Sequence, residues 1–349
     1  MLRPSFMLRP CRDPFAGSVT GYHRCALPTP SVSRLSPALA QAAQELAHAP
    51  LPGSGLTWAR FGALSRWAAR DLSLGRVVEG HADAVAILAE AGMQPSDPAA
   101  LYGVWAARSR RAATTARRGD DGWHLSGHKE FCSGSGLLQR ALVTADTAEG
   151  YRLFDISVPE QVVGTEDNSW QAVGMAASQS ATLEFGGPPV PVDREVGVPG
   201  FYLDRPGFWF GAIGVAACWY GGAVGLVRHI GERLDPTSPD GVLAEFGLAV
   251  AHVEGMRRLL QDASREIDAD PTDAEGRARA RALVVRHGVH HGAVRVLEHT
   301  AAAGGARPLS HDRAQAQRAA DLYVYLAQHH GPQDAVELGR IALEDRSCN

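Results

Sequence analysis

Lysine is almost absent from this chain. Of its 34 Lys and Arg residues, only Lys129 is a lysine. It lies in the stretch GHKEFCSGSG (127–136), which contains one aromatic residue, two serines and three glycines. Such a turn fits a surface hairpin, and it also fits a segment whose backbone approaches another group closely, since glycine has no Cβ. The hairpin alone gives no reason for the only lysine to stand there.

Cysteine pairs, excess positive charge and long apolar runs are also lacking. The five cysteines form no CxxC pair and no zinc-type Cys/His spacing, so we expect neither a zinc site nor a disulfide framework. This pattern fits a reducing compartment, and we expect a cytoplasmic protein. A net charge of −4 argues against nucleic-acid binding. Apolar stretches such as Trp209–Ala217 are too short to cross a bilayer, so no membrane association is expected.

In residues 1–35, Arg and Pro interrupt every apolar run, so we expect a poorly ordered segment that is not a signal peptide. Three zones with different periodicities follow it. Residues 36–100 have helical spacing, with a break near Asp71–Gly75. Residues 101–200 alternate short β-rich runs with turns, which is typical of a small antiparallel barrel or sandwich. Residues 201–349 are helical again, in segments long enough for a four-helix bundle.

The bundle zone has recognisable helix ends. Its first helix, from Gly207, is apolar on nearly all sides and is expected to be buried. Later helices are expected to stop at Gly304-Gly305 and at Gly331-Pro332, and a short one covers 334–343. In the β zone, the Arg-rich run 108–118 is expected to be a solvated loop.

The order of helices, β domain and bundle resembles the acyl-CoA dehydrogenase superfamily of flavoproteins. The stretch GWHLSGHKEFCSGSGLLQRALVTA (122–145) is similar to the strand pair that lines the flavin ring in that family. The resemblance places Phe131 as the aromatic wall and Ser133 as the donor near flavin N5, with Cys132 between them. A flat redox ring needs such a wall and a donor at its reactive edge. Lys129 would then brace the turn without reacting.

Three further stretches carry the resemblance. LYGVWAARS (101–109) stands where backbone amides of the family face the pyrimidine end of the flavin, although a plain buried turn fits it equally. WQAVGMAASQSATLEFGGPPVP (170–191) is similar to a family strand segment. HTAAAGGARPLSHD (299–312) is similar to the family's turn that passes the flavin of a neighbouring subunit. By this resemblance the further flavin-contacting residues are Tyr102, Gly103, Val104, Trp105, Gly304 and Gly305.

The family's catalytic carboxylate is missing from the last long helix, RAADLYVYLAQHHGPQD (318–334). An ungapped match puts His329 at that position, with Gln328 beside it, and a slip of one residue would give His330. Histidine titrates near neutral pH and suits proton transfer. A polar helix end explains these residues equally well. Glu254, on an earlier helix, is the alternative base.

The resemblance implies a flavin-dependent oxidoreductase that binds FAD, removes a proton beside an acyl-thioester carbonyl and passes hydride to flavin N5. A two-component monooxygenase or N-oxygenase is the alternative, with FMN or reduced flavin supplied by a flavin reductase. A catalytically silent scaffold is the third. Arg233 is not followed by the family's FAD-anchoring spacing, which keeps FMN open. We expect a homodimer or homotetramer, because 208–226 and Gly304-Gly305 resemble elements that pack between subunits.

Overall fold

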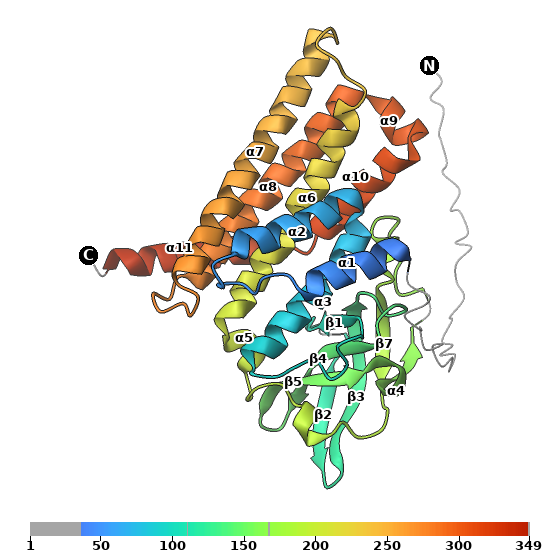
Figure 1. Ribbon diagram of the computed structural model, residues 1–349, viewed down its shortest axis with the longest axis vertical. Helices are drawn as coiled ribbons and strands as arrows, with labels where there is room; N and C mark the ends of the chain where they lie inside the picture. Colours follow the sequence, from blue (N-terminus) through green and yellow to red (C-terminus); the bar gives the residue numbers. More distant parts are fainter. Residues whose placement is uncertain (1–35, 110, 167, 348–349) are drawn as a thin grey trace, which may run out of the picture.

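The computed structural model describes residues 36–109, 111–166 and 168–347, so the expected N-terminal segment lies outside the described residues. The chain forms N-terminal helices, a curled β-sheet and a C-terminal helical bundle, in the predicted order (Figure 1). The expected class, mainly α with a central β domain, is confirmed.

Three helices form the N-terminal part: α1 Pro37–Ala47, α2 Thr57–Arg70 and α3 Leu72–Glu90. The break predicted near Asp71–Gly75 lies at Asp71. This residue follows α2, and its carboxylate accepts a hydrogen bond from the Leu74 amide at 2.9 Å, which caps α3. One residue therefore ends one helix and begins the next, and α3 turns back toward the sheet.

The central part is one seven-stranded mixed sheet, where an antiparallel barrel or sandwich was expected. The strands are β1 Tyr102–Trp105, β2 Thr114–Gly119, β3 Gly122–Cys132, β4 Arg140–Thr147, β5 Gly150–Ser157, β6 Val162–Thr165 and β7 Ala181–Phe185. Strands β1 and β2 both run parallel to β4, and β5 pairs antiparallel with the other edge of β4. The short elements α4 Val158–Gln161, η2 Ala176–Ser178 and η3 Val192–Arg194 interrupt the strand sequence.

The Arg-rich run 108–118 contains most of β2, so its assignment as a loop was wrong. Thr114 and Ala116 point inward while Arg117 and Arg118 are exposed. The arginines belong to the outer face of a half-buried strand, and their density hid its period of two.

The bundle consists of α6 Pro206–Gly231, α7 Asp240–Ala269, α8 Ala278–Gly304 and α10 Arg313–Leu326, with the short α5 Phe201–Asp204, α9 Ala306–His311 and the terminal α11 Gly331–Ser347. Among the described residues, α6 is the one helix long and apolar enough to cross a membrane, but its most apolar window is 72% buried within the chain. It packs on α2, α3, α7, α8 and α10. Its apolar surface is therefore the core of the molecule, and it gives no argument for subunit contacts.

The last long helix ends earlier than predicted. Helix α10 stops at Leu326, and Gly331-Pro332 begins α11 where a helix stop was expected. Proline favours the first turn of a helix, where its missing N–H is not needed. His329 consequently lies in the connection between two helices.

Glycines of α6 let α2 approach very closely. A Cβ built on Gly221 would lie 2.4 Å from the Ser65 carbonyl oxygen and 2.8 Å from the Ala68 Cβ. On the exposed face of α7, a Cβ built on Gly247 meets no atom within 4 Å. The two positions thus offer the same substitution with opposite steric consequences.

We predict that Gly221→Ala destabilises the protein by roughly 1–3 kcal/mol, because the added methyl group forces α2 and α6 apart. Gly247→Ala should stabilise it by up to about 1 kcal/mol, since alanine favours the helix. Urea unfolding midpoints followed by circular dichroism measure both. Equal midpoints for the two variants would contradict the close α2–α6 contact.

Candidate active site

A β-bulge shapes the end of β3. The pairing with β7 shifts between Lys129 and Cys132, and Phe131 adopts a left-handed backbone with φ of 59°. Its ring is 60% exposed, whereas the Cys132 side chain is fully buried with Sγ 3.3 Å from the Lys129 carbonyl oxygen. Phe131 is therefore available as an aromatic wall, and only the backbone of Cys132 is available beside it.

The segment after Phe131 is held by hydrogen bonds to neighbouring elements. The Ser133 hydroxyl lies 3.0 Å from the Ser180 hydroxyl, and the Trp105 indole donates to the Ser133 carbonyl oxygen at 3.0 Å. Trp105 and Tyr102 are themselves buried core residues. Their side chains cannot line a ligand, so any contact from β1 must come from its backbone.

Lys129 braces the end of β1. Its ammonium donates to the Ala107 carbonyl oxygen at 3.3 Å and to the Thr144 hydroxyl at 3.2 Å. The Tyr151 hydroxyl donates to the neighbouring Ala106 carbonyl oxygen at 3.3 Å. Lys129 is only 4% exposed, and burial lowers its pKa to about 8. The only lysine therefore has a positioning role: it fixes the chain that leaves β1 against β3 and β4.

The free edge of β1 faces α3. The Tyr102 amide donates to Nδ1 of His81 at 3.1 Å. A Cβ built on Gly80 would lie 3.9 Å from the Val104 nitrogen and 3.3 Å from Nη1 of Arg76. Backbone of β1 and the guanidinium of Arg76 thus meet at one place beside α3.

Histidines gather in the bundle. His287, His290 and His291 of α8 lie near His329, and the His290 and His329 ring centroids are 4.5 Å apart. Trp219 of α6 packs edge-on against His290, His329 and Tyr325. Sequence reasoning named His329 as a candidate but did not consider the α8 histidines, although HGVHH (287–291) places three histidines at helical spacing.

The structure separates the three candidates at the end of α10. The His329 side chain is 2% exposed and points into the cluster, whereas Gln328 and His330 are exposed. Oδ2 of Asp334 lies 3.4 Å from Nδ1 of His329. Burial, with the charges of neighbouring groups, lowers the pKa of His329 to about 4. His329 is therefore a neutral imidazole at neutral pH.

Several buried polar atoms around Trp219 have no hydrogen-bond partner among the described residues. They are Trp219 Nε1, Tyr325 Oη, His290 Nδ1 and both ring nitrogens of His329. A buried polar atom that stays unpaired costs about 1–3 kcal/mol. A concentration of such atoms fits a place that takes a polar ligand or ordered water.

The alternative base and the glycine turn, both expected in the site, lie outside the groups described above. Glu254, the alternative base, binds Arg257 and Arg258 on its own helix, and these hydrogen bonds lower its pKa to about 2. Its carboxylate belongs to a half-exposed ion-pair network on α7, so we do not propose it as the base. The Gly304-Gly305 turn lies with α9 at the end of the bundle away from the sheet (Figure 1), so within one chain it does not meet Phe131.

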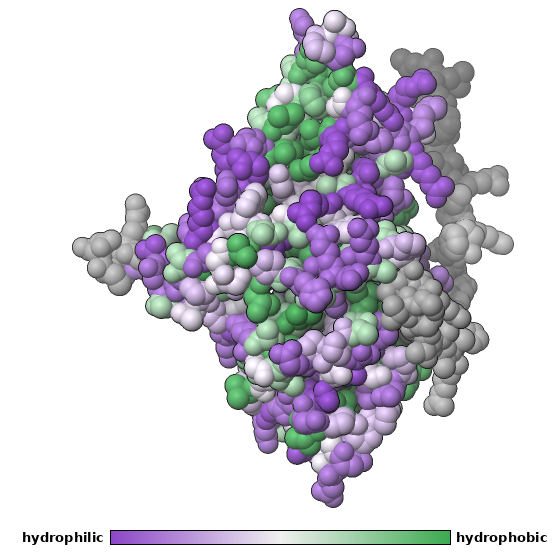
Figure 2. All heavy atoms as spheres, in the orientation of Figure 1, coloured by the Kyte–Doolittle hydropathy of each residue, from purple (hydrophilic) through white to green (hydrophobic). Residues whose placement is uncertain are grey.

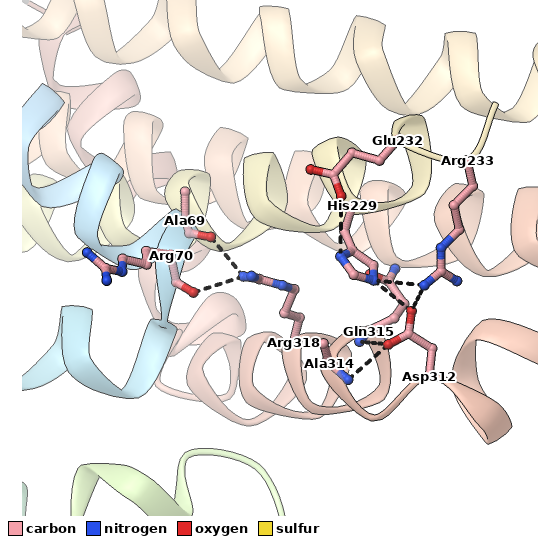
Figure 3. A network of polar contacts seen from close by, with 9 residues as sticks. All are labelled: Ala69, Arg70, His229, Glu232, Arg233, Asp312, Ala314, Gln315 and Arg318. Atoms are coloured by element: carbon pink, nitrogen blue, oxygen red, sulfur yellow. Dashed lines mark hydrogen bonds and ion pairs between the residues drawn. The ribbon is translucent and has the colours of Figure 1, made fainter. Parts of the chain in front are cut away.

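At that end of the bundle, the Asp312 carboxylate contacts the basic side chains of His229 and Arg233 (Figure 3). Its carboxylate lies 2.6 Å from Nε2 of His229 and binds Arg233, and it also caps α10. These partners hold the pKa of Asp312 far below its usual range. Nη1 of Arg318 donates to the Ala69 carbonyl oxygen at 2.8 Å and so links α10 to α2.

No protein-family model and no curated protein sequence matches the chain. Solved structures do match. TdsC, the dibenzothiophene monooxygenase of Paenibacillus sp. A11-2, was solved with FMN and indole; it is 17% identical over 88% of this chain and 96% of its own, with a TM-score of 0.72. MsuC, the methanesulfinate monooxygenase of Pseudomonas fluorescens, is 18% identical over 89% and 97%, with a TM-score of 0.69. KijD3, in complex with dTDP, is 19% identical over 87% and 88%, with a TM-score of 0.73.

The chain has the acyl-CoA dehydrogenase fold. Similarity at this level establishes the fold, and the chemistry has to be argued from the side chains. In this fold the Phe131 turn and the β1 edge both belong to the central β-sheet, and the histidine cluster belongs to the bundle.

We predict that Lys129 makes stability rise with pH between about 8 and 10.5. In that window the unfolded chain keeps the lysine proton that the folded protein has released. Lys129→Met should remove this slope, which amounts to roughly 1–3 kcal/mol. Urea midpoints of both proteins at about pH 8 and pH 10 measure it. No other lysine contributes, so equal pH slopes would contradict a buried Lys129.

Proposed function

We propose that the protein is a monooxygenase that oxidises a small organic substrate with O₂ and a reduced flavin delivered by a separate reductase. The residue at the end of α10 carries the proposal: acyl-CoA oxidation needs a carboxylate there, and the chain has a buried, neutral His329. The dibenzothiophene and methanesulfinate monooxygenases of the same fold support it.

The flavin ring is proposed to lie between the β domain and the bundle. Phe131 offers an exposed aromatic face, and the Ser133 hydroxyl stands two residues away. The backbone edge at Val104 faces the same helix, α3, that carries Arg76. When bound, the flavin would supply the electrons and the reaction with O₂. The residues of the chain would hold the ring, exclude water and move protons.

We propose His329 as a proton-transfer residue. Oδ2 of Asp334 lies 3.4 Å from Nδ1 without an aligned hydrogen bond, and its negative charge would favour a proton on that nitrogen, which leaves Nε2 as an acceptor. In this proposal the neutral imidazole takes up a proton and returns it later. The Tyr325 hydroxyl and the Trp219 indole N–H add two hydrogen-bond donors that have no acceptor among the described residues.

The cofactor we propose is FMN rather than FAD. By family resemblance Arg233 is a candidate to anchor the pyrophosphate of FAD. Its guanidinium is already bound by Asp312 within the same chain (Figure 3). TdsC was solved with FMN, while XiaF of Streptomyces sp. was solved with FADH2.

We also propose a homodimer, whose contact surface would be the α8–α10 end of the bundle and not the buried helix α6. An apolar groove of about 270 Å³ lies between α8, α9 and α10, next to the Gly304-Gly305 turn. Exposed Leu309 and Tyr323 line it. The turn itself, which the family places beside a neighbouring flavin, stands on this face.

Acyl-thioester oxidation is the second candidate, because it would use the same ring position. One observation favours it: α3 carries a buried carboxylate, Glu79, whose charge helps to raise the pKa of Tyr325. Anaerobic addition of acyl-CoA distinguishes the two functions. Bleaching of bound oxidised flavin would favour this candidate and would contradict the monooxygenase.

We predict that His329→Ala lowers the rate of product formation roughly 10²–10⁴-fold, because the proton-transfer group is lost. The exposed neighbour provides the control, and His330→Ala should remain near wild type. The assay combines reduced FMN, O₂ and a panel of small aromatic and organosulfur compounds that begins with indole. If both variants turn over like the wild type, His329 is not the proton-transfer residue.

A further inference from the structure

Four histidines connect the buried end of α10 with the surface of α8. His287, His290 and His291 lie on one side of α8, because residues three and four positions apart are neighbours on a helix. The ring centroids of His290 and His329 are 4.5 Å apart, and those of His287 and His329 are 5.7 Å apart. The imidazole of His329 therefore meets two imidazoles of α8.

His291 is the outer end of this group. Its ring centroid lies 4.1 Å from that of His287 and 5.4 Å from that of His290. Nδ1 of His291 donates to the His287 carbonyl oxygen at 3.0 Å, which leaves Nε2 as the nitrogen that can exchange a proton with solvent. His291 is exposed, whereas the His329 side chain is buried. Adjacent imidazoles thus lead along two branches from a buried ring to water.

The inner rings keep nitrogen atoms free for proton transfer. Nδ1 of His290 and both ring nitrogens of His329 are buried and have no hydrogen-bond partner among the described residues. A neutral imidazole has one nitrogen that donates and one that accepts, so neighbouring rings can pass a proton directly or through one bridging water. Packing alone gives no reason to bury these nitrogens unbonded, since each costs about 1–3 kcal/mol.

Another histidine pair of the bundle shows what a structural contact looks like. His252 of α7 and His299 of α8 stack with their ring centroids 5.5 Å apart. Nδ1 of His299 lies 2.8 Å from Oε2 of Glu245, so this ring has a carboxylate partner. Within the described part of the chain, neither ring contacts another histidine ring. This pair therefore provides a matched control for the four histidines around His329.

We propose that His287, His290 and His291 form a proton relay that connects His329 with solvent. This rests on the proton-transfer role proposed for His329 and adds the path by which that residue regains its starting protonation state. An N–H bond on His329 breaks, an N–H bond forms on an α8 imidazole, and the electron pair stays on the nitrogen that the proton leaves. The last transfer passes the proton from His291 to water. The α8 histidines need no contact with flavin or substrate.

Electrostatics favour transfer of the proton away from the inner rings. Burial lowers the pKa of His329 to about 4, and basic neighbours, Arg286 among them, lower it further. Burial also lowers the pKa of His290. A buried imidazolium is unfavourable because the charge loses its hydration. The inner rings therefore hold an acquired proton weakly and release it toward the exposed His291.

The test follows the ring proton of His329 itself. Nuclear magnetic resonance of the whole protein with isotope-labelled histidine measures how fast that proton exchanges with water, and it needs neither flavin nor substrate. The double variant His287→Phe/His290→Phe keeps an aromatic ring at both positions and removes the nitrogens. We expect its exchange to be slower by roughly 10²-fold, because positioned acid–base groups are lost. His252→Phe, in the separate histidine pair, should leave the rate unchanged.

The direction of the change distinguishes a relay from a structural role, since loosened packing would speed the exchange. Unchanged or faster exchange in the double variant overturns the relay, while the monooxygenase stands. Slower exchange in a protein that turns over no substrate with reduced flavin supports the relay and overturns the monooxygenase. A His329 signal that is too broad to observe in the wild type and sharp in the double variant supports the relay, because it reports fast exchange.

Should the double variant fail to fold, the urea dependence of exchange in the wild type decides. A relay works in the folded protein, so urea below the unfolding transition should not accelerate the exchange of the His329 ring proton. Exchange through opening of the helices exposes new surface and therefore accelerates with urea. Such acceleration would overturn the relay.

Discussion

Around Trp219 the interior of the bundle buries polar atoms that form no hydrogen bond within the described part of the chain. The rest of the structure has to offset the free-energy cost of burying them unpaired. Each such atom costs about 1–3 kcal/mol. The surrounding helices must therefore be held firmly enough to keep them buried. Close glycine contacts between α6 and α2 and the Asp71 cap of α3 provide that rigidity. Sites of this kind store unfavourable interactions that a ligand relieves.

In the proposed site the sheet supplies the side opposite the bundle. Its bulge turns Phe131 outward and Cys132 inward, so that one residue offers an aromatic face while its neighbour packs in the core. Lys129 then fixes the exit of β1 at Ala107, and it does so as a buried cation that no carboxylate neutralises by direct contact among the described residues. Helix α3 lies between the two, in contact with β1 of the sheet and with α6 and α10 of the bundle (Figure 1), while the outer face drawn in Figure 2 mixes hydrophilic and hydrophobic residues.

Much of this was readable from the sequence, because it depends on local patterns. Helical periodicity and turn residues predicted the order of helices, sheet and bundle. The GHKEFCSGSG stretch predicted Phe131 and Ser133 as flavin contacts, and a match to one helix predicted His329 as a catalytic residue; these roles stay predictions. Glu79 and the α8 histidines could not be found that way, since burial of a carboxylate and the meeting of α3, α6, α8 and α10 are tertiary facts. The end of α10 was missed because Gly331-Pro332 begins a helix as readily as it ends one.

The account depends most directly on a flavin ring lying against Phe131. Titration of the protein with FMN, followed by flavin absorbance and fluorescence, tests this with Phe131→Ala and with Leu343→Ala as a control at an exposed apolar residue of α11. We predict saturable binding by the wild type, about tenfold weaker binding by Phe131→Ala, since an aromatic contact contributes up to about 1.5 kcal/mol, and no change for Leu343→Ala. Equal affinity of Phe131→Ala and wild type, or no flavin binding by the wild type, would contradict it.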